Sequence, residues 1–212
     1  MVVIALYSCY ERRYFTNYKQ SIYSGNEKIK IRTDGVYLAK KIEYYKSMIL
    51  REYLIFYSDG ICLLKGITYL KSWDKQKFDS IHKKNSAFYY SRNGFSDFGV
   101  YSIKDSILII QNFEPMPSYR RGVVNTYFKI VNDTTILKYY YEYTFRETFL
   151  PGHEGIEQYI DKDIFGIGKL TVKLTHPIEY NFYKYDNTDS CQAWFYKKRW
   201  YKKNLHESRK NN

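Results

Sequence analysis

This sequence of 212 residues lacks the features that most readily reveal a function. No apolar run reaches the roughly 18 residues that a membrane-spanning helix needs. We find no internal repeat and no linker between domains, so a single domain is expected. The four histidines are dispersed, which argues against a metal site: His82, His153, His176 and His206.

Motifs of catalysis and phosphate binding are also missing. His153-Glu154 begins like a zinc-protease helix, but the position that needs the second histidine holds Glu157. Residues 166–169 resemble a phosphate loop without its spacing or its Ser/Thr, so we expect a turn before a strand. No Gly-x-Ser-x-Gly elbow occurs. The sequence therefore predicts neither an enzyme nor a bound cofactor.

Aromatic residues are abundant, with 26 Tyr and 13 Phe, and 44% of the chain is hydrophobic. That is enough apolar material for a sizeable core. Flat rings suit a pleated, half-buried surface, so this composition favours strands. An AT-rich coding bias is an alternative cause of the many tyrosines, but the rings must still be placed in the fold.

The net charge of +12 is unevenly distributed. Residues 197–212 hold seven basic residues and one acidic residue, so this segment carries half of the net positive charge. We therefore define 192–212 as a basic C-terminal tail. Such a tail is most often a solvated terminus, although it can also bind nucleic acid or an anionic membrane. Basic and aromatic residues also meet at Tyr119-Arg120-Arg121, but strand aromatics beside solubilising lysines explain them better, so nucleic acid is not an expected partner.

The first residues, 1–20, are expected to be a truncated lipoprotein signal and tether. Leu6-Tyr7-Ser8-Cys9 has the apolar residue, the small residue and the cysteine of a lipobox, in which Cys9 is acylated. The apolar segment is short and has no basic residues before it, so we expect a start codon further upstream. This predicts a bacterial envelope protein, anchored by lipid at the outer membrane or periplasmic face. The alternative is a cytoplasmic protein whose first strand buries Cys9.

Export would leave two further cysteines, Cys62 and Cys191, in an oxidising compartment, where they can form a disulfide. The alternative is that both are unpaired and serve as small apolar residues. Cys62 lies in the apolar run 61–64, which favours the second interpretation.

Turn dipeptides divide the middle of the chain into four predicted hairpins. Two further strands are expected at 169–175 and 178–185. The hairpins are Lys28–Arg32 with Val36–Lys40 around Asp34-Gly35, Tyr53–Tyr57 with Ile61–Leu64 around Asp59-Gly60, Phe98–Ile103 with Ile107–Phe113 around Asp105-Ser106, and Val123–Val131 with Thr134–Thr144 around Asn132-Asp133.

Two of these strands, 53–57 and 107–110, are apolar on both faces. An antiparallel sheet of this kind must cover both faces, as a closed barrel packed from outside by a helix or a partner would. Residues 72–85 are expected to form a short helix after Ser72 or a long loop, and 153–159 a helical turn or lid. The predicted fold is an all-β antiparallel barrel over 21–191, with about 8–10 strands and one or two short helices.

Four segments carry a resemblance to a known family: Ile31–Tyr37, Leu54–Gly60, Phe98–Gln111 and Tyr127–Thr135. In this order they resemble the lipocalin-like bacterial lipoproteins over residues 29–143. The resemblance implies an up-and-down barrel that binds an apolar or amphipathic small molecule. It transfers no ligand residues, because the matching motifs are turns.

An aromatic lining is the expected binding site, and the candidate residues are Phe56, Tyr101, Phe113 and Tyr139. Core packing is the alternative role for each of them. Three other functions stay open: a structural or interaction lipoprotein whose filled barrel binds another envelope protein, an enzyme on the same barrel, and a nucleic-acid-binding barrel.

Overall fold

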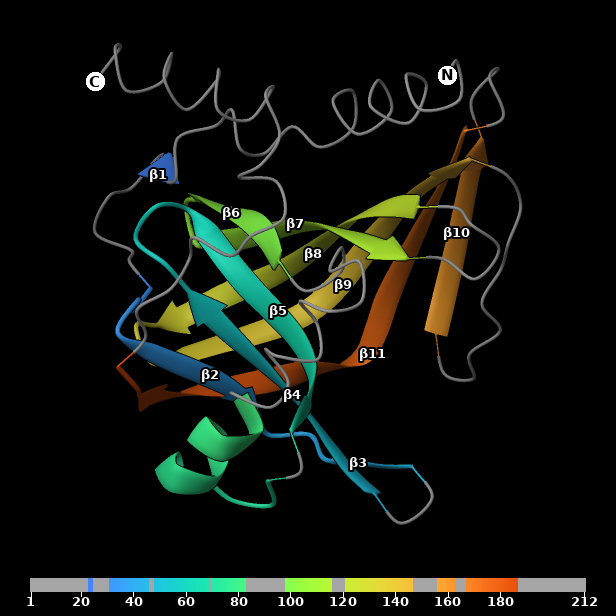
Figure 1. Cartoon of the computed structure of the whole chain (residues 1–212). Coiled ribbons are helices and arrows are strands. Elements are labelled where there is room, and N and C mark those ends of the chain that lie inside the picture. Colours follow the sequence, from blue (N-terminus) through green and yellow to red (C-terminus); the bar gives the residue numbers. More distant parts are fainter. Residues whose placement is uncertain are drawn as a thin grey trace, which may run out of the picture.

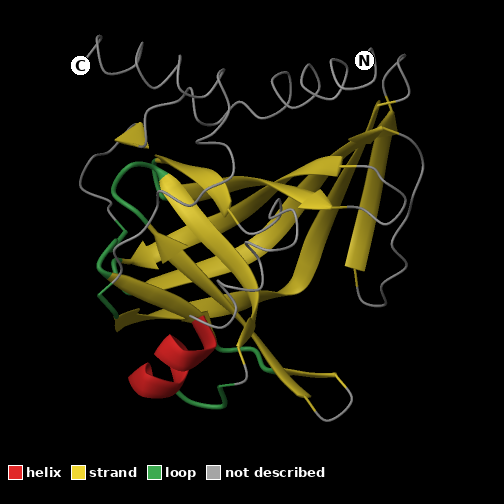
Figure 2. Cartoon of the chain, in the orientation of Figure 1, coloured by secondary structure: helices red, strands yellow, loops and turns green. Residues whose placement is uncertain are grey.

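The computed structural model describes residues 23–24, 31–45, 48–68, 70–82, 98–115, 121–146, 156–162 and 167–186. These residues contain eleven strands in one sheet, together with a helix over 75–82. Eight of the strands close into a barrel, and the helix packs against its outside (Figures 1 and 2).

The eight barrel strands follow one another around the wall in sequence order, and each is antiparallel to the next. The last strand returns to the first and closes the barrel. The predicted all-β, lipocalin-like up-and-down barrel is confirmed. Its strands are β2 (Gly35–Ala39), β4 (Met48–Phe56), β5 (Ile61–Thr68), β6 (Phe98–Lys104), β7 (Ile107–Pro115), β8 (Arg121–Asn132), β9 (Thr135–Arg146) and β11 (Ile167–Lys184).

Three shorter strands extend this wall. β1 (Tyr23–Ser24) lies parallel to β6, β3 (Glu43–Tyr45) pairs with β4, and β10 (Ile156–Lys162) pairs with the first half of β11. The helical turn predicted over 153–159 is wrong for residues 156–159, which belong to β10; residues 153–155 lie outside the described part. β11 is much longer than β2, and its first half takes β10 as a partner instead.

β11 also unites the two strands predicted at 169–175 and 178–185. Its pairing with β9 shifts register between Lys173 and Ile178, so four residues bulge opposite a single residue of β9. Pro177 lies within this bulge. Proline has no N–H to donate, and within a strand it is tolerated at such irregularities.

Three of the four predicted hairpins form, and their turns meet at one end of the barrel. Gly60 has a φ of 86° after a turn in which its amide donates to the Tyr57 carbonyl at 3.2 Å. Asp105 has a φ of 56° in the two-residue turn between β6 and β7. In the third turn, Asn132 Oδ1 accepts a hydrogen bond from the Thr134 amide at 3.0 Å.

The hairpin predicted around Asp34-Gly35 is wrong over residues 31–40, and residues 28–30 lie outside the described part. Ile31 and Arg32 are outside any strand, and Gly35 begins β2, where it pairs with Lys184. A Cβ at Gly35 would collide with the Tyr183 carbonyl and the Phe182 ring. Glycine is therefore needed here for close approach between strands, not for a turn.

Inside the barrel, apolar side chains from all eight strands form one buried cluster. Strand alternation places Leu54 and Phe56 in it, as predicted for one face of residues 53–57. Its buried members are Ile31, Tyr37, Ala39, Leu54, Phe56, Cys62, Tyr101, Ile103, Leu108, Ile110, Phe128, Ile130, Ile136 and Tyr180.

The other face of β4 packs outward against the helix over 75–82, so both faces of this strand are covered. Tyr53 is fully buried there, with its ring centroid 4.9 Å from that of Phe78. The helix begins after Asp74 rather than after Ser72. Asp74 Oδ1 accepts a hydrogen bond from the Lys77 amide at 3.0 Å, which is the geometry of an N-cap.

Candidate functional site

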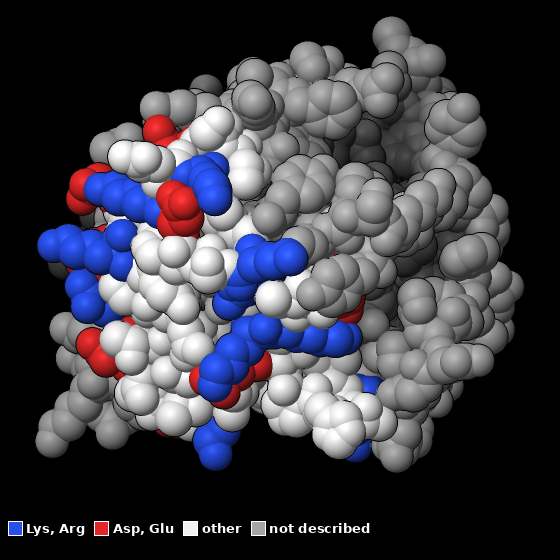
Figure 3. All heavy atoms as spheres, turned by 90° about the horizontal axis from the view of Figure 1, so that it is seen from below, with Lys and Arg blue, Asp and Glu red and all other residues white. Residues whose placement is uncertain are grey.

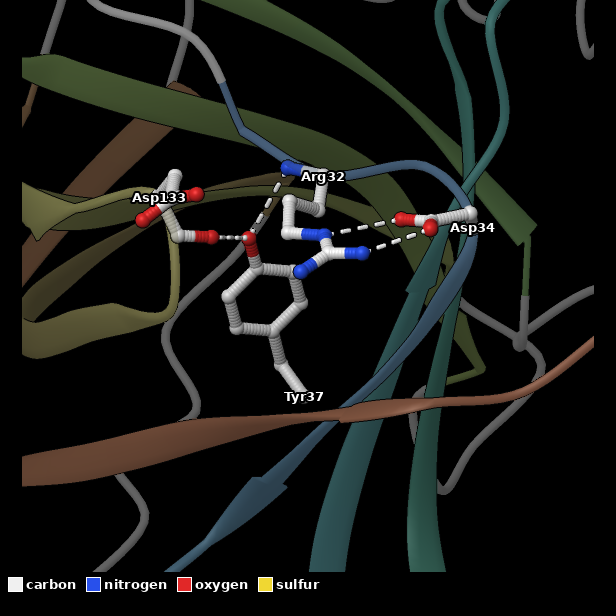
Figure 4. Close-up of polar contacts among 4 residues, drawn as sticks. All are labelled: Arg32, Asp34, Tyr37 and Asp133. Atoms are coloured by element: carbon white, nitrogen blue, oxygen red, sulfur yellow. Dashed lines mark hydrogen bonds and ion pairs between the residues drawn. The ribbon is translucent and has the colours of Figure 1, made fainter.

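The two ends of the barrel differ in chemistry, and the end that carries the hairpin turns is closed. The fully buried Tyr37 donates its hydroxyl hydrogen to the Asp133 carbonyl at 2.6 Å and accepts from the Arg32 amide at 3.0 Å (Figure 4). The Arg32 guanidinium pairs with Asp34 at 2.7 Å and lies 4.2 Å from the centre of the Phe182 ring. Packing and hydrogen bonds therefore close this end.

Towards the opposite end, the inner wall becomes polar. Glu52 of β4 lies two residues before Leu54 and so shares its inward face. Its Oε2 accepts hydrogen bonds from the Tyr180 hydroxyl and from Lys138 Nζ, the latter at 3.0 Å. The three side chains come from β4, β9 and β11, and we call them the Glu52 network.

The Glu52 network favours one set of protonation states. Desolvation raises the pKa of Glu52, but the Lys138 charge and the hydrogen bond from Tyr180 outweigh it and hold that pKa below its usual value. Burial and the neighbouring Glu52 charge raise the pKa of Tyr180 well above its usual value. At neutral pH the network therefore contains a carboxylate and an un-ionised phenol.

A small pocket opens beside the Glu52 network. It has a volume of about 70 Å³ and is lined by Ala39, Lys41, Glu43, Leu50, Glu52 and Ile178. Lys41 and Glu43 form an ion pair at 2.8 Å, and both side chains are more than half exposed. The pocket therefore combines apolar walls with charged groups, a combination typical of sites that orient a small ligand.

Another polar group is buried on β7. Asn112 of β7 is 2% exposed, and within the described structure its Oδ1 has no hydrogen-bond partner. Its ladder partners are Gly99 and Val124, neither of which carries a polar side chain. An unpartnered buried acceptor costs free energy, so this position is not explained by core packing.

Two of the four predicted pocket residues meet inside the barrel. The rings of Phe56 and Tyr101 contact edge to face at 5.1 Å, and Tyr101 donates its hydroxyl hydrogen to the Tyr57 carbonyl at 2.7 Å. Both residues belong to the buried interior cluster, where the packing role is sufficient to explain them.

The structure does not bring the other two to this pair. Phe113 lies in β7 opposite Val123, and its side chain is outside the described part. Tyr139 is half-buried at a bulge of β9, with its ring 4.7 Å from that of Tyr140, and it does not belong to the interior cluster. The predicted lipidation site, Cys9, also lies outside the described residues.

Sequence reasoning did not identify the Glu52 network, although part of the signal was present. Alternation from Leu54 places Glu52 on the inward face, and a charged residue among inward apolar positions deserves a functional explanation. Lys138 and Tyr180 carry no comparable signal. Their positions depend on the register of β9 and β11, which the bulges in these strands alter.

Surface charges in the described part are mixed in sign. Lysines and carboxylates intermingle on the face seen from below (Figure 3). Several form exposed ion pairs, among them Lys40 with Glu179 at 2.9 Å and Lys75 with Asp186 at 3.4 Å. The basic tail over 192–212, which holds half of the excess charge, lies outside the described residues.

No protein-family model matches this sequence, and neither does any curated protein or solved structure. The resemblance to lipocalin-like lipoproteins therefore stays a prediction. Among the described residues, no helix has the length and apolarity to cross a membrane, and no three His, Cys, Asp or Glu side chains gather to hold a metal. Cys62 is a buried free thiol, while its predicted partner Cys191 is outside the described part.

Proposed function

We propose that this barrel binds a small amphipathic molecule in the pocket beside the Glu52 network. The ligand places its polar group against Glu52 and its apolar part against Ala39, Leu50 and Ile178. One observation carries the proposal: a charged, hydrogen-bonded network stands on the inner wall beside an apolar-walled pocket.

The Glu52 network is not needed to fill the barrel. Apolar side chains pack the interior elsewhere, and removing charges from water costs more than burying such side chains. The Lys138 side chain is only 13% exposed, so most of it is removed from water. Charged groups retained at such a cost are concentrated at functional sites.

The volume of the pocket limits what enters it. Ligand pockets for whole drug-sized molecules are several hundred Å³ in volume, whereas this one has about 70 Å³. We therefore assign to it the polar end of the ligand and the adjacent carbon atoms. The rest of the molecule would extend beyond the pocket.

A fragment library screened by amide NMR tests this function. Hits should shift the backbone amides of residues 39, 52 and 178 in the wild type. Ile178→Trp fills the pocket and should abolish these shifts, whereas Val131→Trp, at a position 52% exposed outside the pocket, should preserve them. If no fragment perturbs the pocket, or if Ile178→Trp binds as well as the wild type, the proposal is wrong.

A second candidate function is a structural or interaction protein with a filled barrel. The interior cluster from all eight strands supports it. So does the outer wall of β8 and β9, where the half-buried rings of Tyr127 and Tyr140 stack at 4.0 Å. Native mass spectrometry of the purified chain separates the two candidates, because a small-molecule adduct supports the first and a retained protein partner supports the second.

We also propose attachment to a bacterial membrane through Cys9. Leu6, Ser8 and Cys9 support it, as the lipobox-like residues. Cys9→Ser should release the full-length product from the membrane fraction. Unchanged fractionation would remove the anchor from the proposal without affecting the pocket.

A further inference from the structure

We infer that Arg51 is a positioning residue that sets the width of the pocket beside Glu52. This inference rests on the proposed function and adds a residue that is not among the described residues lining the pocket. Arg51 lies in β4 between Leu50 and Glu52, which do line it. Its side chain points to the opposite face of the strand, because successive residues of a strand alternate. Arg51 therefore acts on the pocket through the backbone that it holds.

The pocket lies at a gap between two ladders of β4. β2 pairs with β4 as far as Leu38 and Tyr53, and β3 resumes the pairing at Glu43 and Leu50. Residues 39–42 therefore face a shorter stretch of β4 and bulge away from it. This gap lies at the base of the hairpin that β3 and β4 extend from the barrel (Figure 1). The lining residues on its two sides are Ala39, Lys41 and Glu43, and Leu50 and Glu52.

The forked side chain of Arg51 bridges this gap. Its Nε donates a hydrogen bond to the Ala39 carbonyl, at the end of β2. Its Nη1 donates to the Lys71 carbonyl at 3.0 Å, in the segment that leads from β5 to the helix over 75–82. The donors of a guanidinium are fixed in one plane, so the two hydrogen bonds are made together. A single side chain of β4 thus holds the backbone on both sides of that strand.

The Lys71 end of the bridge is attached to a packed part of the protein. Trp73 stacks on Tyr183 of β11, with 4.9 Å between the ring centroids. The Trp73 ring also lies 5.3 Å from that of Phe78, a helix residue that is fully buried. Because the Lys71 end is held in this way, the bridge can keep the Ala39 carbonyl at a fixed distance from β4.

The position of Arg51 is a costly one for a cation. Arg51 is 7% exposed, and no carboxylate of the described residues pairs with it. Burial lowers the pKa of Arg51, which is the direction expected for a cation removed from water. Tyr53 and Ile55, on the same face of β4, belong to the apolar cluster there. An apolar side chain could fill the position of Arg51, but it could not hold two carbonyls.

The amphipathic probe 1-butanol tests this inference through the amide NMR shifts of residues 39, 52 and 178. Arg51→Met keeps an apolar stem but loses both hydrogen bonds, so the gap widens and the affinity for 1-butanol should fall about tenfold. Arg51→Lys keeps the charge, but its donors share one nitrogen and cannot reach both carbonyls, so it should weaken binding about threefold.

Tyr53→Phe is the matched control. Tyr53 is the next residue on the same face of β4, and its hydroxyl contacts His82 Nδ1 at 3.1 Å without reaching across the gap. This variant should bind 1-butanol like the wild type. Each variant is measured under conditions in which its urea unfolding curve shows it to be folded, so that a lower affinity reports on the pocket and not on global unfolding.

The bridge also has a signature that needs no ligand. A carbonyl carbon that loses a hydrogen bond shifts upfield, so the ¹³C signal of the Ala39 carbonyl should move upfield in Arg51→Met and stay in place in Tyr53→Phe. An unchanged signal in Arg51→Met would overturn the inference, and so would wild-type affinity for 1-butanol in that variant. If Arg51→Met does not fold, the same two measurements on Arg51→Lys decide.

The failures of the two proposals are distinguishable. If 1-butanol binds Arg51→Met as well as the wild type, the positioning role is wrong and the binding function stands. If 1-butanol leaves the wild-type amides unshifted, the inference is overturned. If the fragment library leaves them unshifted too, the proposed function is wrong as well.

Discussion

Glu52 and Lys138 meet on the inner wall of the barrel with 3.0 Å between Oε2 and Nζ, although they are 86 residues apart in the sequence. Because of this pair, the free energy of unfolding should decrease at acidic pH. The pKa of Glu52 in the folded state lies below its ordinary value of 4.5. The stabilisation that ionised Glu52 gives the fold is therefore fully present above that value, and it is lost as the pH falls through the folded-state pKa.

We expect the free energy of unfolding of the wild type to fall more steeply between roughly pH 6 and pH 3 than that of Glu52→Gln. At neutral pH the variant should be less stable by about 1–2 kcal/mol, since Lys138 loses its partner. Asp186→Asn, which removes an exposed pair, should track the wild type. Parallel pH profiles for the wild type and Glu52→Gln in urea titrations would show that the pair does not control acid stability.

Tyr37 should stabilise the closed end through its hydroxyl as well as its ring. Tyr37→Phe removes the hydrogen bonds to Asp133 and Arg32 and should cost about 1–2 kcal/mol in urea unfolding. Tyr37→Leu also loses the edge contacts with Phe56 at 5.5 Å and Phe182 at 5.3 Å, and it should cost more, about 3 kcal/mol. Wild-type stability in Tyr37→Phe would contradict this role.

Asn112 and its neighbour Gln111 provide a matched pair on opposite faces of β7. Asn112 Oδ1 has no partner within the described structure, so Asn112→Leu should stabilise the protein by about 1 kcal/mol in thermal unfolding. Gln111 donates to Asn125 Oδ1 at 2.8 Å, so Gln111→Leu should destabilise it by a similar amount. Destabilisation by Asn112→Leu would mean that Asn112 has a partner in solution.

Asp74 should determine where the helix over 75–82 begins. Asp74→Ala removes the acceptor of the Lys77 amide and should cost about 1 kcal/mol. Hydrogen exchange should quicken in the first turn of the helix, because that turn loses its cap. Lys75→Ala, which alters only an exposed ion pair, should leave exchange there unchanged.

Local chemistry made most of the barrel predictable. Asp59-Gly60, Asp105-Ser106 and Asn132-Asp133 form turns because each supplies a residue suited to a tight reversal. Asp34-Gly35 has the same local appearance, but Gly35 serves a contact with β11, which is distant in the sequence. A dipeptide cannot distinguish these two uses of glycine.

The candidate site was less predictable because it depends on register. Alternation alone places Glu52 inside the barrel. Lys138 faces it only because β9 bulges opposite Tyr127 and Phe128, and Tyr180 follows the Pro177 bulge of β11. Each bulge changes which residues share a face beyond it. The abundance of aromatic residues in strands points to Phe56 and Tyr101, which belong to the core, and does not point to Glu52.

The pairing of β2 with β11 determines which strands can pair first while the chain is being synthesised. Tyr37 lies opposite Phe182, so the seam joins a strand made early to the last barrel strand to leave the ribosome. Hairpins such as β6–β7 and β8–β9 join neighbouring segments and can form during synthesis, but the edge of β2 must wait for almost the whole chain. Until then the nascent sheet is open along that edge, which exposes it to premature pairing with another chain.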